Sequence, residues 1–435
     1  MVSRYSRVSL LLLAALVLPS SAAAFSLFRS QDGGLSVRLT GYVKTLAFGL
    51  VDRIVPETRD IPGGVVAGPT GGGNGAAPLP TTENTAEDFM RARLMLEGDV
   101  GPHVSWALHY EHYAVINPAR EATLGLFAGR SSTNSQRSSL LKLDWTARET
   151  GSLFWRHELD RLNVRFALPL ADIVIGRQAI SWGVGRFWTP SDLFVAFSPV
   201  EIDKEFKTGV DAVSVKVPLG PLSQVETVYA AFGESFRRHS AGVRARTTVG
   251  NFDMGMMGGK FFHDFVIGPF FDGGIKGVGV RGEFTFTHNT ADHSLERRTF
   301  FRGVGSVDYR FANDLYTLLE YYYNGFGRAN PEDYPQLFTS DRFARNEIFN
   351  VGLHYLGAAL GYQLHPLVNT NLTGLWNLLD QSALIGPVVD VSLSDEANLR
   401  TGAYFPVGTS FVGRRVQSEY GLYSQVYYLE LRRYF

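Results

Sequence analysis

Residues 35–44 read Leu35-Ser36-Val37-Arg38-Leu39-Thr40-Gly41-Tyr42-Val43-Lys44, and apolar and polar residues alternate along them one by one. Successive side chains of an extended strand point to opposite faces, so one face of this segment is apolar and the other polar. A helix would scatter the same charges around its axis. The sequence therefore predicts an all-β protein, because the same alternation recurs at 90–97, 161–168, 213–217, 243–249 and 368–376.

The connections between the predicted strands alternate between short and long. The short turns are expected at 99–103, 169–171, 218–222, 250–252, 273–274, 311–314, 365–367 and 394–397. The longer connections are expected at 51–86, 117–155, 183–209, 234–238, 288–298, 324–347, 379–382 and 409–418. A soluble sandwich or propeller would also show the alternating strands, but it does not explain this asymmetry. The pattern is typical of a transmembrane antiparallel β-barrel with short periplasmic turns and long extracellular loops.

Counting hairpins predicts about 16 to 18 strands. The Gly-rich stretch 253–287 has a weak register, and it leaves both counts open. Aromatic residues make up 13% of the chain, and they can supply the girdles that such a barrel carries at both membrane interfaces.

Composition excludes several other classes of protein. The 435 residues contain no Cys, which excludes a disulfide scaffold, a Cys-ligated metal centre and a thiol nucleophile. A formal net charge of -1 argues against a nucleic-acid-binding chain. His109 and His112 lie three apart on a predicted strand, so their side chains point to opposite faces and cannot share a metal ion. We therefore expect no enzyme activity, no catalytic residues, no cofactor and no metal site.

The first 24 residues have the three regions of a secretory signal peptide. Arg4 and Arg7 precede an apolar run at 8–18, which is followed by the small residues 22–24. The apolar run is too short to span a membrane as a helix. The sequence therefore predicts cleavage after Ala24, which leaves residues 25–435 as one barrel domain.

The C-terminus resembles the terminal β-signal of Gram-negative outer-membrane barrel proteins. Gly421 precedes a strand on which Tyr427, Leu429, Leu431 and Phe435 share one face, and the chain ends on this Phe. In that family the assembly machinery reads the final Phe. The usual pattern has an apolar or aromatic residue where this chain has Arg433, which could reach headgroups at the membrane interface.

A second resemblance lies near the middle of the chain. The segment Gly176-Arg177-Gln178, followed by Trp182-Gly183, is similar to a strand end of several porin-like barrels. The two resemblances imply a porin-like barrel in the outer membrane of a Gram-negative bacterium, without identifying a subfamily. Its expected partners are outer-membrane lipid, the assembly machinery through Phe435 and small solutes, and a homo-oligomer is compatible with the fold.

Two functions follow from this expectation and stay open. The first is a channel for passive passage of small solutes. The second is a sleeve or exporter channel for a polysaccharide, a lipid or an electron-carrying protein partner. An electron carrier would have to be supplied by another chain, because this one has no haem or iron-sulfur motif.

Charged residues on the inward faces of the predicted strands are candidates for lining the pore. Rings of basic side chains favour anion passage, whereas Arg and Glu on neighbouring strands could pair and only brace the wall. Both interpretations remain open. The candidates are Arg38, Lys44, Arg91, Arg93, Glu97, Arg161, Arg165, Arg177, Lys216, Arg244, Arg246, Arg281, Glu283 and Glu320.

The connection 183–209 is expected either to fold into the barrel as a constriction or to cover the outer rim as a lid, because its aromatic residues need a surface. Thr189 can cap a helix, Pro190 suits the first helical position and Asp192 suits the first turn, so a short helix is predicted there. The candidate constriction residues are Arg186, Phe187, Trp188, Asp192 and Phe194.

Overall fold

The computed structural model describes residues 25–30, 33–51, 84–116, 139–290, 298–412 and 415–435. The predicted signal peptide, 1–24, lies outside the described residues. The strands are β1 (Phe25–Arg29), β2 (Leu35–Val51), β3 (Thr85–Val100), β4 (Val104–Ile116), β5 (Asp144–Thr150), β6 (Leu153–Ala167), β7 (Asp172–Gln178), β8 (Val210–Pro218), β9 (Ser223–Ala230), β10 (Ser240–Val249), β11 (Phe252–Phe261), β12 (Asp264–Ile275), β13 (Val278–Asn289), β14 (Thr299–Arg310), β15 (Tyr316–Asn324), β16 (His354–His365), β17 (Val368–Asn377), β18 (Ala383–Ser394), β19 (Ala397–Val407), β20 (Phe411–Val412), β21 (Arg415–Val416) and β22 (Gln425–Tyr434).

Helical segments are short and lie in connections between strands. They are η1 (Phe236–Arg238), η2 (Pro331–Asp333), α3 (Tyr334–Phe338), α4 (Asp341–Ala344) and η3 (Tyr420–Leu422). Over the described ranges, no helix has the length and apolar character needed to cross a membrane.

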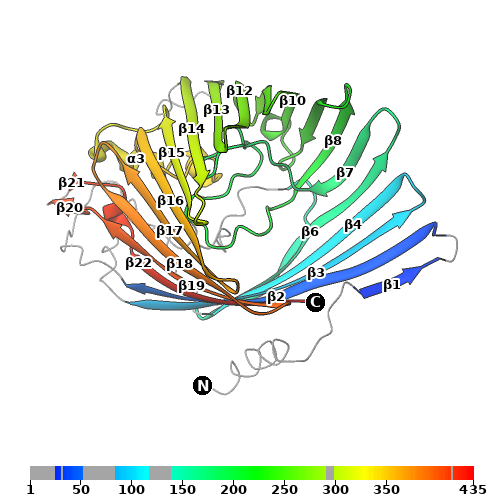
Figure 1. Cartoon of the computed structure of the whole chain (residues 1–435), viewed down its shortest axis with the longest axis horizontal. Coiled ribbons are helices and arrows are strands. Elements are labelled where there is room, and N and C mark those ends of the chain that lie inside the picture. The colour runs from blue at the N-terminus through cyan, green and yellow to red at the C-terminus, as the bar shows by residue number, and fades with distance from the viewer. Residues whose placement is uncertain (1–24, 31–32, 52–83, 117–138, 291–297, 413–414) are drawn as a thin grey trace, which may run out of the picture.

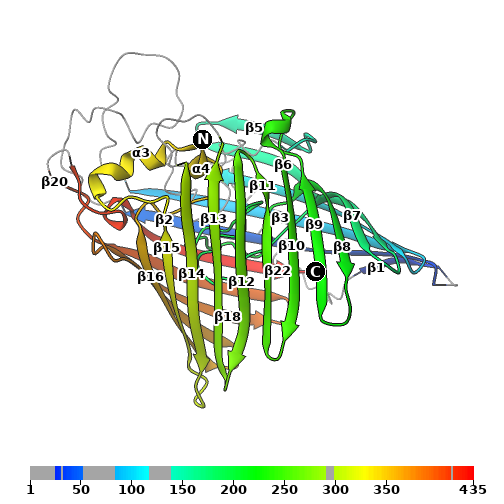
Figure 2. The same cartoon turned by 90° about the horizontal axis from the view of Figure 1, so that it is seen from above.

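The main sheet closes on itself into a barrel (Figures 1 and 2). β2 pairs with β3 on one side and with the last strand, β22, on the other, so the ring of strands is closed. The sheet contains 20 strands, of which β1 pairs only with β2 and β5 only with β6, so 18 antiparallel strands form the ring. This confirms the predicted barrel and decides between the two expected strand counts.

One hairpin in the Gly-rich stretch differs from prediction. β12 continues through Gly273 and Gly274, which pair with β13, and the chain turns at Lys276 and Gly277. Both turn residues have positive φ, 51° and 88°, as a tight two-residue hairpin requires. The predicted turn at 273–274 was therefore wrong by about three residues. The connection between β11 and β12 at 262–263, which the sequence did not predict, completes the eighteen strands.

The predicted two-faced strands are confirmed by the exposure of their side chains. Val243 of β10, Ile267 of β12 and Phe286 of β13 point outward and are about half exposed. The alternate positions, such as Phe270 and Glu283, point inward and are buried. An apolar outer face with a polar and aromatic interior is the arrangement that acyl chains require of a membrane barrel.

Strand β7 is too short to cover the full height of the wall, and part of a long connection takes its place. β5 pairs with the first part of β6, residues 153–158, whereas β7 pairs with its last part, residues 162–167. We call the end of the barrel at 153 the upper end. Below β5, the Leu159 N–H donates to the Leu143 carbonyl at 2.8 Å, and Ser139 forms a bridge with Phe232. Residues 139–150 therefore complete the barrel wall above β7.

Beyond β7, the chain turns into the barrel. We call residues 179–209 the inner loop, the rim that carries the long connections the long rim, and the opposite one the short rim. Figure 1 shows the inner loop running inside the ring of strands before β8 begins.

The C-terminal residue helps to close the ring. Gly41 of β2 and Phe435 exchange both backbone hydrogen bonds, at 2.9 and 3.0 Å. A Cβ atom at Gly41 would lie 2.6 Å from the Phe435 ring, so only glycine leaves room for this aromatic residue. The final Phe is therefore packed into the closing seam of the barrel.

Candidate functional site

Two buried glutamates hold the first half of the inner loop against β13 and β15. Glu320 accepts hydrogen bonds from the backbone N–H groups of Arg186, Phe187 and Trp188, at 2.7 to 2.9 Å. Glu283 accepts from the Val184 N–H at 2.7 Å and from the Ser191 hydroxyl at 2.6 Å. Hydrogen bonds to a charged acceptor are stronger than neutral ones, so this part of the loop is firmly tied to the wall.

The second half of the inner loop is held on the opposite side of the barrel by ion pairs. Asp203 lies 2.5 Å from Lys44 of β2 and 2.5 Å from Arg91 of β3. Glu205 lies 2.9 Å from Arg432 of β22. Burial raises the pKa of Asp203, but Arg91 and Lys44 outweigh that effect and hold this pKa well below its usual range. The loop therefore spans the lumen between two walls.

A third set of contacts joins the end of the inner loop to β6. Asp160 accepts from the Gly209 N–H at 3.0 Å and from Arg93 at 2.6 Å. Arg161 donates to the Lys207 carbonyl at 2.5 Å, and Lys207 forms an ion pair with Asp192 within the loop. Charged groups buried this deeply need such partners, because their desolvation is otherwise costly.

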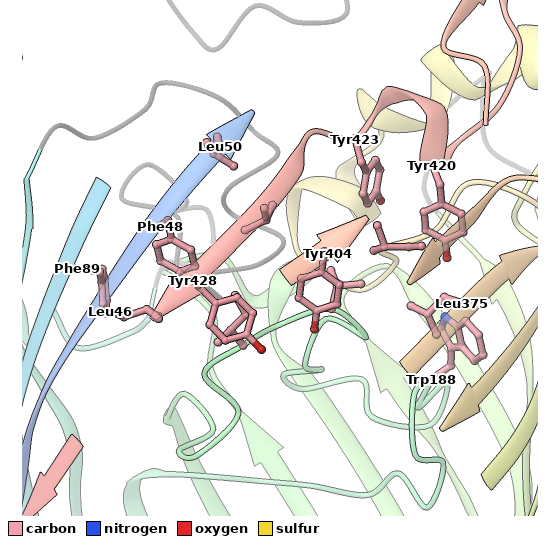
Figure 3. Packing of buried hydrophobic residues seen from close by; sticks show 14 of the residues in the cluster. Leu46, Phe48, Leu50, Phe89, Trp188, Leu375, Tyr404, Tyr420, Tyr423 and Tyr428 are labelled. Carbon is pink, nitrogen blue, oxygen red and sulfur yellow. The ribbon is translucent and has the colours of Figure 1, made fainter. Parts of the chain in front are cut away.

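Aromatic side chains of the inner loop pack into the long-rim half of the barrel. Trp188 stacks on Tyr322 with ring centroids 5.3 Å apart, and its indole N–H donates to Asn350 at 2.8 Å. It belongs to one apolar cluster with inward-facing residues of β2, β3, β17, β19 and β22, several of which Figure 3 shows. Tyr404 and Tyr428 lie side by side in this cluster. Phe194 packs against Trp182 and Phe261 in a second cluster.

The short helix predicted near Thr189 does not form. The structure has only a turn there, in which the Asp192 N–H donates to the Thr189 carbonyl at 2.9 Å. The N–H groups of 186–188, just before this turn, donate to Glu320, and the Ser191 hydroxyl within it donates to Glu283. Carboxylates from distant strands therefore hold the segment in a conformation that is not helical.

The five candidate constriction residues have different environments. Trp188, Asp192 and Phe194 are buried in the contacts that anchor the loop. Phe187 is partly buried, and its ring lies where a Cβ at Gly357 of β16 would be. Among the five, Arg186 alone is exposed. It is thus the one candidate whose side chain is free to meet a solute.

Several candidate pore-lining residues lie under the inner loop rather than beside open space. Lys44, Arg91 and Arg93 are at most 3% exposed. Arg161, Glu283 and Glu320 are buried as well. These six side chains point inward, but their contacts are with the loop and with one another, so they act as anchors.

The short-rim half of the lumen carries a second group of charged candidates, which form ion pairs between neighbouring strands. At least one side chain of each pair is partly exposed, and the pairs are Arg165 with Asp172 at 2.8 Å, Lys216 with Glu226 at 3.6 Å, Arg246 with Asp253 at 3.7 Å, Arg281 with Asp272 at 3.3 Å and Glu97 with His109 at 3.0 Å. The wall is therefore polar and wet here, with its charges largely balanced.

Arg177 does not line the lumen, so its assignment to the pore was wrong. It shares a face of β7 with Ile175, which is 48% exposed on the outside of the barrel. It forms an ion pair with Asp211 at 2.8 Å and donates to the carbonyls of Leu141 and Leu159. Arg177 therefore joins the end of β7 to the wall segment above it.

Among the candidate pore-lining and constriction residues, three basic ones have no carboxylate within 4.0 Å in the described chain. They are Arg38 of β2, Arg186 of the inner loop and Arg244 of β10. Arg38 is exposed, and it lies opposite Glu97 in the strand register. Arg244 lies over the ring of Phe270, 4.1 Å from its centroid. Most of the candidate cations are therefore neutralised by a close partner.

A recess in the wall lies on the short-rim side of the inner loop. Its volume is about 330 Å³, and charged and amide side chains of β6 to β9 line it together with the start of the loop. The residues that line it include Arg165, Asp172, Gln178, Lys216 and Glu226. A small polar solute could therefore be accommodated at this place in the lumen.

Sequence reasoning missed a buried carboxylate network near the long rim. Glu419 accepts from Asn350 at 2.8 Å, from Asn377 at 3.1 Å and from the Tyr355 hydroxyl. Burial raises the pKa of Glu419 to about 7. The network ties the connection 408–424 to the neighbouring connections, and no local pattern around Glu419 could have revealed partners so distant in sequence.

No group of three or more His, Asp or Glu side chains in the part of the chain that the structure describes is arranged to hold a metal ion. His112 and His157 do come together across β4 and β6, with ring centroids 5.0 Å apart, but they lie on the outer face of the barrel.

Comparisons with known proteins show the fold. No protein-family model and no curated protein matches this sequence. Among solved structures, OccAB1 of Acinetobacter baumannii superposes with a TM-score of 0.55 at 10% identity, covering 96% of this chain and 99% of that one. A BenF-like porin from Pseudomonas fluorescens gives a TM-score of 0.52 at 8% identity, covering 92% and 98%. The chain therefore has the fold of outer-membrane porins.

Proposed function

We propose that this chain is a porin-like channel that lets small solutes cross the outer membrane of a Gram-negative bacterium by passive diffusion. The observation that carries the proposal is the wet, charged wall on the short-rim side of the inner loop. Arg165 and Lys216 are inward-facing there and half exposed, as is Asp272 on the facing β12. Such exposure inside a closed barrel means that water fills this half of the lumen.

Conductance tests the proposal directly. Purified protein inserted in planar bilayers is expected to give stepwise currents, because water and ions can pass between the inner loop and the short-rim wall. The same preparation should migrate differently on a gel before and after heating, which shows that the barrel is folded. A folded barrel that stays closed at every voltage would contradict the channel function.

An anion preference is the finer part of this proposal. Most of the candidate cations are paired, so the preference would rest on those without a close carboxylate, Arg38, Arg186 and Arg244. Removing a unit charge about 4 Å from a passing ion in water changes its energy by about 1 kcal/mol, or about fivefold in permeability ratio. The predicted bias is therefore modest.

The reversal potential in a salt gradient measures this bias. The variant R186Q/R244Q is expected to shift the reversal potential toward cations. The matched control R165Q/D172N removes both members of an exposed pair, leaves the net charge unchanged and should not shift it. If the two variants give the same reversal potential as the unaltered protein, the charges only brace the wall and the channel has no anion preference.

The anchored inner loop favours small solutes over the second candidate function, a sleeve or exporter for a polysaccharide, a lipid or an electron-carrying partner. A large cargo needs an unobstructed lumen, whereas this loop is held by carboxylates and cations of opposite walls. Recognition of the C-terminus by the assembly machinery is part of the same proposal. Phe435 reaches its place in the seam only when β22 pairs with β2, so it would be accessible before the barrel closes.

A further inference from the structure

The outer face of the barrel carries histidines near the ends of the strands at the long rim. His157 contacts the hydroxyl of Tyr110, while His239 and His354 lie 2.6 Å from the hydroxyls of Tyr229 and Tyr321. The outer face at the short rim carries highly exposed leucines, such as Leu170, Leu219 and Leu364, together with aromatic residues such as Tyr309 and Tyr362. Contacts between histidine and tyrosine side chains thus distinguish the long rim in the described chain.

The largest group of these long-rim side chains lies on β4, β5 and β6, and we call it the outer patch. Its members, which the strand register places on one outer face, are Tyr110, His112, Trp145, Arg148, Trp155 and His157. Trp145 stacks on His157 with centroids 4.9 Å apart and planes 7° from parallel. The Trp155 indole N–H donates to Nδ1 of His112 at 3.1 Å. These contacts fix both imidazole rings on the surface.

The hydrogen bonds of the outer patch decide which groups are free to bind a ligand. An indole N–H is only a donor, so Nδ1 of His112 accepts and the neutral ring carries its proton on Nε2. The Tyr110 hydroxyl contacts Nδ1 of His157, and because a hydroxyl can donate or accept, this contact leaves both tautomers of the His157 ring open. Among the described residues, none accepts a hydrogen bond from Nε2 of either ring. The patch thus offers the Nε2–H donor of His112 beside Arg148, and a second one from His157 when that ring carries its proton on Nε2.

The charge of the outer patch is positive. Arg148 is exposed and lies opposite Trp155 in the register, with no carboxylate within 4.0 Å in the described chain. The two acids of β5, Asp144 and Glu149, lie on the inner face of the barrel. The strand register places them opposite Glu158 and Phe154, which face inward. The next acid on the outer face is Asp88, which lies opposite Ile116 and accepts from Thr45 at 2.7 Å.

We propose that the outer patch binds the phosphate group of a phosphorylated lipid in the outer leaflet of the membrane. Arg148 supplies the charge and a planar set of donors that suits phosphate oxygens, and the imidazoles supply further N–H groups. The rings of Trp145 and Trp155 are the kind that settles at the boundary between headgroups and acyl chains. This inference rests on the position of the barrel in a membrane and not on its conducting solutes.

Lipid titration of the full chain in detergent, followed by native mass spectrometry, tests the site. The probes are bisphosphorylated lipid A and the same lipid with both phosphates removed, and the first is expected to bind more tightly. R148Q should weaken binding of the phosphorylated lipid about fivefold, since a basic residue at an anionic membrane surface contributes about that factor. H112F/H157F should weaken it at least about tenfold, because at least one hydrogen bond to a charged group is lost.

The matched control is H354F, which removes the histidine of another Tyr–His pair whose strands carry no basic residue facing outward at that level. This variant should bind like the unaltered protein. All variants should keep their heat-dependent gel mobility and their conductance, because the outer patch does not face the lumen. Equal affinity for the two lipids, unaltered binding by R148Q and H112F/H157F, or complete displacement of the lipid by millimolar sodium phosphate would each overturn the proposal. Loss of conductance with lipid binding intact would contradict only the channel function.

Discussion

Replacing Glu283 and Glu320 together by alanine is expected to raise the single-channel conductance several-fold. These two carboxylates accept the hydrogen bonds that hold residues 184–191 against the wall. Each hydrogen bond to a charged group contributes about 1.5 to 3 kcal/mol, so the variant loses most of what keeps this segment in place. A barrel of this strand number without an anchored loop leaves a wide aqueous channel.

Planar-bilayer recordings measure the effect, and the current of the double alanine variant should also become noisier as the loop moves. The pair R165Q/D172N serves again as a control, because it alters the short-rim wall without touching the loop anchors. Its conductance should stay close to that of the unaltered protein. If E283A/E320A conducts at the same level as this control, the inner loop does not limit the flow of ions.

The variant D203N should lower the free energy of unfolding by about 3 to 5 kcal/mol, the usual cost of removing one partner of a buried ion pair. Asp203 neutralises Lys44 and Arg91, which are both buried. Glu205 at 3.6 Å from Lys44 and Glu111 at 3.2 Å from Arg91 compensate in part, so the loss should fall toward the lower end of that range. The midpoint of urea unfolding in detergent, followed by tryptophan fluorescence, measures it.

An exposed ion pair provides the comparison for D203N. Arg415 and Glu332 lie 3.1 Å apart, and their side chains are 73% and 56% exposed. The variant E332Q should therefore change the free energy of unfolding by less than about 1 kcal/mol. Equal effects of D203N and E332Q would show that the charges under the inner loop do not stabilise the barrel.

The strands were predictable because their pattern is local. The alternation at 35–44 depends only on which side of the sheet meets lipid, and the structure confirms it. The same rule places Arg177 with Ile173 and Ile175 on the outer face, but its charge suggested the lumen. A segment from a distant connection lies over Arg177 and supplies one of its partners, the Leu141 carbonyl, and no pattern near residue 177 predicts that segment.

The conformation of the inner loop depends on partners that lie far away in the sequence. Its backbone N–H groups donate to Glu283 and Glu320, which lie 99 and 134 residues further on, so local capping preferences near Thr189 are outweighed by these contacts. The turn at Phe262 and His263 was missed for a different reason. It contains no Gly, Pro or Asn, and Phe262 adopts a φ of 53° that a residue of its kind rarely has.

The barrel wall above β7 is formed by part of the connection between β4 and β6, so the barrel stays closed only if this connection keeps its length. Residues 139–150 belong to the connection between β4 and β6, yet they occupy the position of a strand between β6 and the end of β9. An affinity tag or a deletion placed within them would open a sideways gap toward the lipid, where a change in an ordinary surface loop would leave the barrel tight. Anyone who grafts sequences onto this scaffold should therefore treat residues 139–150 as part of the barrel wall and leave their length unchanged.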